Sequence, residues 1–159
     1  MIQHLKQPTA DTCSSTCIAM ITGLQVEKII SEFHADYCAR PYEVNEYTYL
    51  RDLGLNVECC QAIDGLDSEY VYIVVVPSLN LKATLHTVVV YWNVDEHDDL
   101  LPVVHDPNRG KEGKMWYHIN KDREEEYRSQ GGELFGSFVP LVRIAWDDVL
   151  SFRTSRGIT

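Results

Sequence analysis

The start of the chain carries residue types suited to thiol chemistry. Cys13 opens a helical pattern and follows a polar loop that begins at Gln7. Unpaired backbone N–H groups and the helix dipole in a first helical turn favour a thiolate, which makes a thiol a usable nucleophile near neutral pH. The side-chain amide of Gln7 and the backbone N–H of Cys13 are donors suited to a developing oxyanion. This segment therefore predicts a nucleophile with its oxyanion hole.

A base and an acid occur later, in two neighbouring strand-like runs. His86 begins the first run, while Asp106 follows the second and precedes Pro107. If the runs form a hairpin centred on residue 96, His86 directly faces Asp106, and opposed Cβ atoms lie about 4.5–5.5 Å apart. The carboxylate would accept the proton of Nδ1, leaving Nε2 to take the thiol proton. Because Pro107 ends the strand, Asp106 is expected at an exposed rim.

The other cysteines and histidines fit different roles. Cys17 lies one helical turn after Cys13 and is expected to face the core as a small hydrophobic residue. Strand alternation places His105 on the face opposite Asp106. No paired acid is expected for His34, His97 and His118, and His4 lies in the N-terminal tail. A zinc site formed by Cys13, Cys17 and His86 is an alternative that needs a fourth ligand.

These segments resemble the bacteriocin-processing, double-glycine-type cysteine peptidases, a family of the papain-like clan. The resemblance rests on Gln7, Cys13 with the following Cys17-Ile18-Ala19-Met20-Ile21, His86-Thr87-Val88-Val89 and Asp106-Pro107. It covers roughly residues 7 to 107, and the later strand at 139–146 is in keeping with it. The resemblance implies a two-lobed fold in which the helix of the thiol packs against an antiparallel sheet that carries the base and the acid.

Three positions depart from the family pattern. Thr12 stands where the family usually has Asp, Ser14 where it has Gly, and Thr87 where it has an aromatic residue. A serine in place of glycine is expected to narrow the approach to the thiol. The chain also lacks the membrane and ATPase parts of the transporter-linked members, so a stand-alone domain is expected.

Hydrophobic periodicity predicts helices in the first part of the chain and strands in the second. Helices are expected at 14–23, 26–33 and 44–53, and strands at 56–63 (or a connection there), 70–76, 85–92, 101–105, 114–119 and 139–146. Gly23 is the expected C-cap of the first helix. The charged segment 120–130 is interpreted as an exposed helix or a mobile insertion, and Trp146 begins a short last helix.

The predicted fold class is α+β, a papain-like two-lobed fold with N-terminal helices packed on a mainly antiparallel β-sheet. One domain is expected over residues 1–159, with a helical lobe at about 8–55 and a β lobe at about 56–150. The 45% hydrophobic content is sufficient for a core without cross-links.

Charge and cysteine usage limit the partners. The chain has 24 acidic and 14 basic residues and a net charge of -10. Nucleic acid is therefore not an expected partner, because a phosphate-backbone binder needs clustered positive charge. No apolar run is long enough to cross a membrane, and the first residues are too polar for a secretory signal. An odd number of cysteines without a C-x-x-C pair predicts free thiols and a cytoplasmic location.

The expected function is a thiol hydrolase that cleaves a peptide or isopeptide bond of a protein or peptide substrate, without a metal or organic cofactor. Glutamine deamidation by the same triad is an alternative, because it differs only in the leaving group. A third interpretation is a protein-binding module with a weakened site, which would use the charged segment 122–126 as its interaction surface. Such a charge run is more often only a solvated face.

Overall fold

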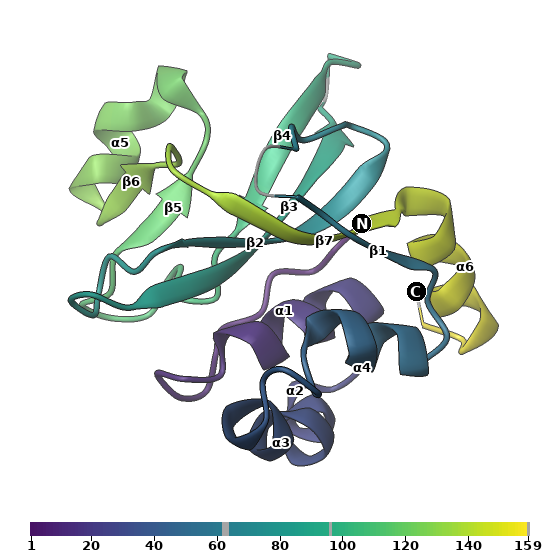
Figure 1. The fold of residues 1–159 in the computed structure, drawn as a ribbon. Helices are drawn as coiled ribbons and strands as arrows, with labels where there is room; N and C mark the ends of the chain where they lie inside the picture. The colour runs from purple at the N-terminus through teal and green to yellow at the C-terminus, as the bar shows by residue number, and fades with distance from the viewer. Residues whose placement is uncertain (62–63, 96, 159) are drawn as a thin grey trace.

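Residues 1–61, 64–95 and 97–158 are described by the computed structural model in Figure 1. The end of the strand predicted at 56–63 and the midpoint of the predicted hairpin lie outside the described residues. Within the described part of the chain, no helix has the length and apolar character needed to cross a membrane.

The first part of the chain is helical, as its periodicity predicts. Its helical elements are α1 Cys13–Thr22, α2 Val26–Ile29, a π-helical turn Ile30–His34, α3 Ala35–Ala39 and α4 Glu46–Asp52. Gly23 ends α1 in the left-handed conformation, with φ of 72°, and its N–H donates to the carbonyl oxygen of Ala19 at 2.8 Å. The predicted C-cap is therefore confirmed. The helix predicted at 26–33 continues to Ala39 through the π-helical turn.

An antiparallel sheet forms most of the second part. Its strands are β1 Val57–Cys59, β2 Tyr70–Pro77, β3 Leu85–Val94, β4 Leu100–His105 and β7 Val139–Ala145. Among the described residues their order is β1-β7-β2-β3-β4, and each neighbouring pair is antiparallel. The short strands β5 Trp116–His118 and β6 Gly132–Leu134 pair in parallel outside this sheet. The α+β class with a mainly antiparallel sheet is thus confirmed.

The charged segment predicted as an exposed helix or a mobile insertion is helical. It contains a 3-10 turn, Lys121–Arg123, and α5, Glu124–Ser129, and neither has a buried residue. Its charges form ion pairs between residues three and four positions apart, as expected on a solvated helix face. The last helix, α6 Trp146–Ser155, directly follows β7, as predicted.

The main sheet has an apolar core on each face. Helices α1 to α4 cover one face (Figure 1). The side chains of Ile18, Phe33, Leu50 and Val89 are fully buried there. The other face packs against the β5–β6 unit through residues that include Val74, Val88 and Tyr117. Successive side chains of a strand point to opposite faces, which is why the neighbours Val88 and Val89 lie in different cores. The sheet therefore holds the helical part and the β5–β6 unit on opposite sides.

Candidate active site

Cys13 is the first residue of α1 and is partly exposed. Thr12, the residue before it, does not cap the helix with its side chain. Its hydroxyl is bonded instead to the preceding loop, where it donates to Thr9 O and accepts the Thr9 N–H, both at 3.2 Å. The first-turn N–H groups of α1 therefore receive no acceptor from the side chain of Thr12, and the positive end of the helix dipole is directed at Cys13.

His86 and Asp106 meet, although not by the direct opposition that the sequence predicts. The β3–β4 hairpin pairs Val90 with Val104 and not with the predicted partner Pro102. The register is shifted by two residues because β3 continues two residues beyond its predicted end. A shift of two keeps each side chain on its predicted face, so His86 reaches Asp106 as a diagonal neighbour. Nε2 of His86 lies 2.8 Å from Oδ1 of Asp106.

The two ring nitrogens of His86 have roles opposite to those predicted. Nε2 is bound to Asp106, so Nδ1 is the nitrogen that remains for the thiol of Cys13. A neutral imidazole donates from one nitrogen and accepts at the other, so either arrangement supports proton transfer. The acid thus still selects the tautomer of the base, but with the nitrogens exchanged.

Asp106 is buried, which corrects the prediction of an exposed rim position. Its side chain is 1% exposed, because the turn after Pro107 and strand β5 cover it. Besides His86, the carboxylate accepts the N–H of Asn108 on Oδ1 at 2.7 Å and the N–H of Tyr117 on Oδ2 at 2.9 Å. These main-chain donors leave no side-chain signal in the sequence. They fix the orientation of the carboxylate and satisfy its buried oxygens.

The electrostatics of the site favour a thiolate beside an imidazolium. Burial by itself raises the pKa of the Cys13 thiol, but the hydrogen bond and charge of His86, together with Thr87, outweigh burial and lower the pKa. Burial lowers the pKa of His86, yet the hydrogen bonds to Asp106 and Cys13 prevail and raise it to about 9. Opposite charges that stabilise each other give these two opposite shifts. Near neutral pH both shifts promote the ion pair.

Thr87 belongs to the site, although the sequence marks it only as a departure from a family pattern. Its Oγ1 lies 3.7 Å from Sγ of Cys13 and 3.1 Å from Oγ of Ser14. Ser14 and Thr87, two of the three positions that differ from the family pattern, therefore contact each other. Ser14 is buried, and its hydroxyl is directed toward Thr87 and toward Tyr37 Oη at 3.5 Å. The serine hydroxyl is thus engaged within the protein.

Gln7 is held next to the acid. Its backbone N–H donates to the carbonyl oxygen of Pro107 at 3.1 Å, and its own carbonyl oxygen accepts from Lys111 Nζ at 2.9 Å. The side-chain amide nitrogen donates to Thr9 O at 2.7 Å, which uses one of its two protons. Oε1 is buried and has no hydrogen-bond partner among the described residues. The structure therefore attaches the loop before Cys13 to the Asp106–Pro107 segment, with one amide proton of Gln7 still to be used.

Cys17 has the structural role that its spacing predicts. The side chain is fully buried, and its Sγ lies 3.3 Å from the carbonyl oxygen of Thr87. Burial raises the pKa of Cys17 well above that of an ordinary thiol. Across the residues that the structure describes, no group of three or more His, Cys, Asp or Glu side chains could hold a metal ion.

Two other histidines lie close to the site. His105 is on the face opposite Asp106, as predicted, and its Nε2 is 3.1 Å from both Tyr91 Oη and Ile2 O. Burial and the nearby charge of His4 lower the pKa of His105 to about 4, which keeps it neutral. His4 is 2.7 Å from the carbonyl oxygen of Asp106, a contact that its position near the start of the chain does not suggest.

An apolar groove lies at the ends of β2, β3 and β7, next to the strand that carries His86 and Thr87. It has a volume of about 410 Å³ and is lined by Val75, Val76, Pro77, Leu85, Ser137, Phe138, Val139 and Leu141. Cross-strand pairing places Val139, Val75 and Thr87 in one row, and Thr87 contacts Cys13. Adjacent strands are about 4.8 Å apart, so the groove begins one strand away from the residue that touches the thiol.

Comparisons with known proteins do not add to this geometry. No protein-family model matches the chain, and no curated protein or solved structure is significantly similar to it. The evidence for function is therefore the arrangement of Cys13, His86 and Asp106, with Thr87 and Gln7 beside them.

Proposed function

We propose that this chain is a cysteine hydrolase with a papain-like two-lobed fold, similar to the bacteriocin-processing peptidases, that cleaves a peptide or isopeptide bond. The observation that carries the proposal is the triad, in which buried Asp106 holds His86 at 2.8 Å and His86 interacts with a thiol at the start of a helix. The opposite pKa shifts of Cys13 and His86 support it, because perturbed pairs of this kind mark functional sites.

In the proposed reaction the Cys13 thiolate attacks the carbonyl carbon of the substrate. The first-turn N–H groups of α1 and the remaining amide proton of Gln7 are the donors for the oxyanion of the tetrahedral intermediate. The His86 imidazolium donates its Nδ1 proton to the leaving nitrogen, and a thioester on Cys13 remains. His86 then removes a proton from water, which attacks the thioester and releases the acid. Asp106 stays ionised and stabilises the imidazolium in both steps.

The apolar groove indicates that the proposed substrate carries an apolar side chain near the bond that is cleaved. Its walls are almost entirely aliphatic and aromatic, and the side chain of Leu85, the residue before His86, is 73% exposed. A peptide placed over Cys13 would bury an apolar side chain there, and each buried CH₂ is worth about 0.8 kcal/mol. The five free cysteines fit a compartment that keeps thiols reduced, which supports the cytoplasm as the location.

The test combines labelling with cleavage. Limiting iodoacetamide across a pH series, read by peptide mass spectrometry, should label Cys13 first and at a pH below the range in which ordinary thiols react. His86→Ala should move the reaction of Cys13 toward the pH range of an ordinary thiol. A peptide library digested with the wild-type protein should show cuts that Cys13→Ala lacks, whereas Cys17→Ala keeps them.

The outcomes separate the competing functions. Cuts beside apolar residues support the peptidase, and deamidated glutamines without cuts identify the alternative amidase reaction. Slow, uniform labelling of all five cysteines with no change to any peptide would exclude the hydrolase and favour a binding module.

A further inference from the structure

A second cluster of Cys, His and Asp side chains lies on the surface of the helical part. Nε2 of His34 lies 3.3 Å from Oδ2 of Asp11. Sγ of Cys38 lies 3.7 Å from the same nitrogen and 4.0 Å from Nδ1, so the sulfur is in contact with the imidazole and within reach of both nitrogens. The sequence-based expectation that His34 has no paired acid is therefore wrong.

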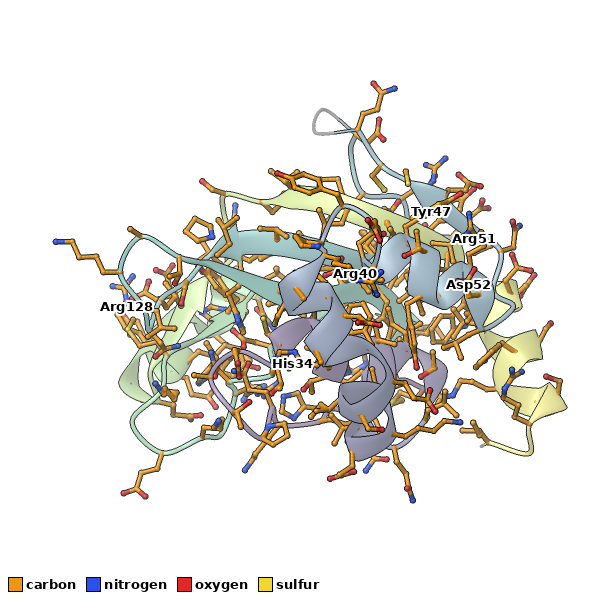
Figure 2. All side chains as sticks on the ribbon, turned by 60° about the horizontal axis from the view of Figure 1, so that its bottom comes forward. His34, Arg40, Tyr47, Arg51, Asp52 and Arg128 are labelled. Carbon is orange, nitrogen blue, oxygen red and sulfur yellow. The ribbon has the colours of Figure 1, made fainter. Side chains whose placement is uncertain are left out.

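The helical backbone brings these residues together. His34 and Cys38 are four residues apart in the continuous helical segment 26–39, which places them on one face. Figure 2 shows His34 on this segment, in front of the sheet. Asp11 comes from the loop before α1 and approaches the same ring. The i, i+4 spacing of His34 and Cys38 was visible in the sequence, but the contact with Asp11 depends on tertiary structure.

Exposure separates this cluster from the triad. Cys38 is exposed, and the side chains of His34 and Asp11 are 16% and 69% exposed. The hydrogen bond from Thr9 and a backbone contact lower the pKa of Asp11; burial opposes them, and the interaction with His34 lowers the pKa further. Asp11 is therefore an anion at neutral pH, and its carboxylate lies within hydrogen-bond distance of the His34 ring.

We propose that Cys38 is a second reactive thiol and a site of reversible modification by small disulfides, with His34 as its base and Asp11 as the carboxylate that holds the imidazolium. Nδ1 of His34 accepts the Cys38 proton while the Nε2 proton remains directed at Asp11. The thiolate attacks one sulfur of the disulfide, the original S–S bond breaks and a mixed disulfide forms on Cys38. The departing thiolate takes the proton from His34 and leaves as a thiol.

The position of Cys38 makes the imidazole necessary. Cys38 is the second-last residue of α3, and the negative end of a helix dipole disfavours a thiolate. Asp36 is close in sequence, and its charge is already paired with Arg40 at 3.1 Å. Of the groups in contact with the sulfur, His34 is the one that can take its proton.

The chain contains its own comparison thiol. Cys59, in β1, is exposed like Cys38, and no imidazole contact to it is present among the described residues. Its neighbour Cys60 is partly buried, and burial raises the pKa of Cys60 to about 11, so Cys60 reacts slowly. Measuring in a Cys60→Ser background ensures that modification of Cys60 is not mistaken for modification of the adjacent Cys59.

The experiment follows mixed-disulfide formation with oxidised glutathione at pH 7 by peptide mass spectrometry. Because His34 contacts the Cys38 sulfur and can take its proton during the attack, Cys38 should react about three- to tenfold faster than Cys59. His34→Gln should lower the Cys38 rate to that of Cys59 or below, and Asp11→Asn should lower it in part. Lys28→Gln, on the same helical segment and paired with Glu32, should leave it unchanged.

Circular dichroism of each variant confirms that the helices remain folded. Equal rates for Cys38 and Cys59 in the wild-type protein would overturn the proposal, as would an unchanged Cys38 rate in folded His34→Gln. If Cys38 of the Asp11→Asn variant formed the mixed disulfide as fast as in the wild-type protein, the proposed role of the Asp11 carboxylate would be wrong.

Discussion

At the scale of single residues, Asp106 combines burial with three accepted hydrogen bonds. Its two oxygens accept hydrogen bonds from Asn108, Tyr117 and His86, and the residue is almost fully buried. A carboxylate suits these contacts because it only accepts hydrogen bonds. An amide of the same shape would turn an NH₂ group toward one of the donors. Asp106 is therefore fitted both to orient His86 and to stabilise the fold around it.

Asp106→Asn should lower both stability and reactivity. We expect a loss of about 1–3 kcal/mol in the free energy of unfolding, because a buried donor is left without an acceptor. Reactivity should fall by about 10²- to 10⁴-fold, the upper figure being that of a serine triad. Urea unfolding measures the first effect, and the pH profile of Cys13 alkylation measures the second. Exposed Asp99→Asn is the control, and an unchanged alkylation profile in Asp106→Asn would contradict the triad.

At the scale of secondary structure, apolar periodicity and turn residues define the helices and most strands. The predictions for α1, for the start of α2 and for β7 agree with the structure because each has a clear apolar pattern and a clear end. The hairpin register was wrong by two residues because Asn93 and Val94, which the sequence analysis assigned to the loop, continue β3. The roles of the His86 nitrogens and the burial of Asp106 depend on tertiary contacts, so the sequence could not specify them.

The end of α1 offers a test of how firmly this helix is placed. Gly23 has φ of 72°, and an added Cβ would lie 2.5 Å from Cγ2 of Ile158. Gly23→Ala should therefore lower the free energy of unfolding by at least about 1–2 kcal/mol. Gly136→Ala, where an added Cβ meets nothing within 4 Å, should change it by less than about 0.5 kcal/mol. If the two variants were equally stable in urea, α6 and the C-terminal residues would have moved to accommodate the added methyl group without a loss of stability.

At the scale of the whole molecule, the main sheet is shared by two cores. Helices α1 to α4 pack on one face, and the β5–β6 unit packs on the other. Trp116 belongs to the β5–β6 unit, whereas Trp146 stacks on Tyr91 with ring centroids 5.7 Å apart, next to the helical core. The two tryptophans therefore report on opposite sides of the sheet.

The predicted single domain should unfold in one transition. Because both cores need the same strands, fluorescence of Trp116 and of Trp146, each measured with the other tryptophan and Trp92 replaced by Phe, should give coincident urea curves. Phe33→Ala, which empties a fully buried site on the helical side, should cost about 3–5 kcal/mol and shift both curves together. Earlier unfolding at Trp116 would instead identify the β5–β6 unit as a separate folding unit.

The three hydrogen bonds to Asp106 also have a consequence for motion. The amide protons of Asn108 and Tyr117 are bonded to a buried carboxylate, and these residues come from the turn after Pro107 and from β5. Amide protons held in this way exchange with solvent only when the local structure opens. Their deuterium exchange rates therefore measure how often the acid of the site is released. Hydrogen–deuterium exchange can therefore follow the local opening around Asp106 in the protein without a substrate.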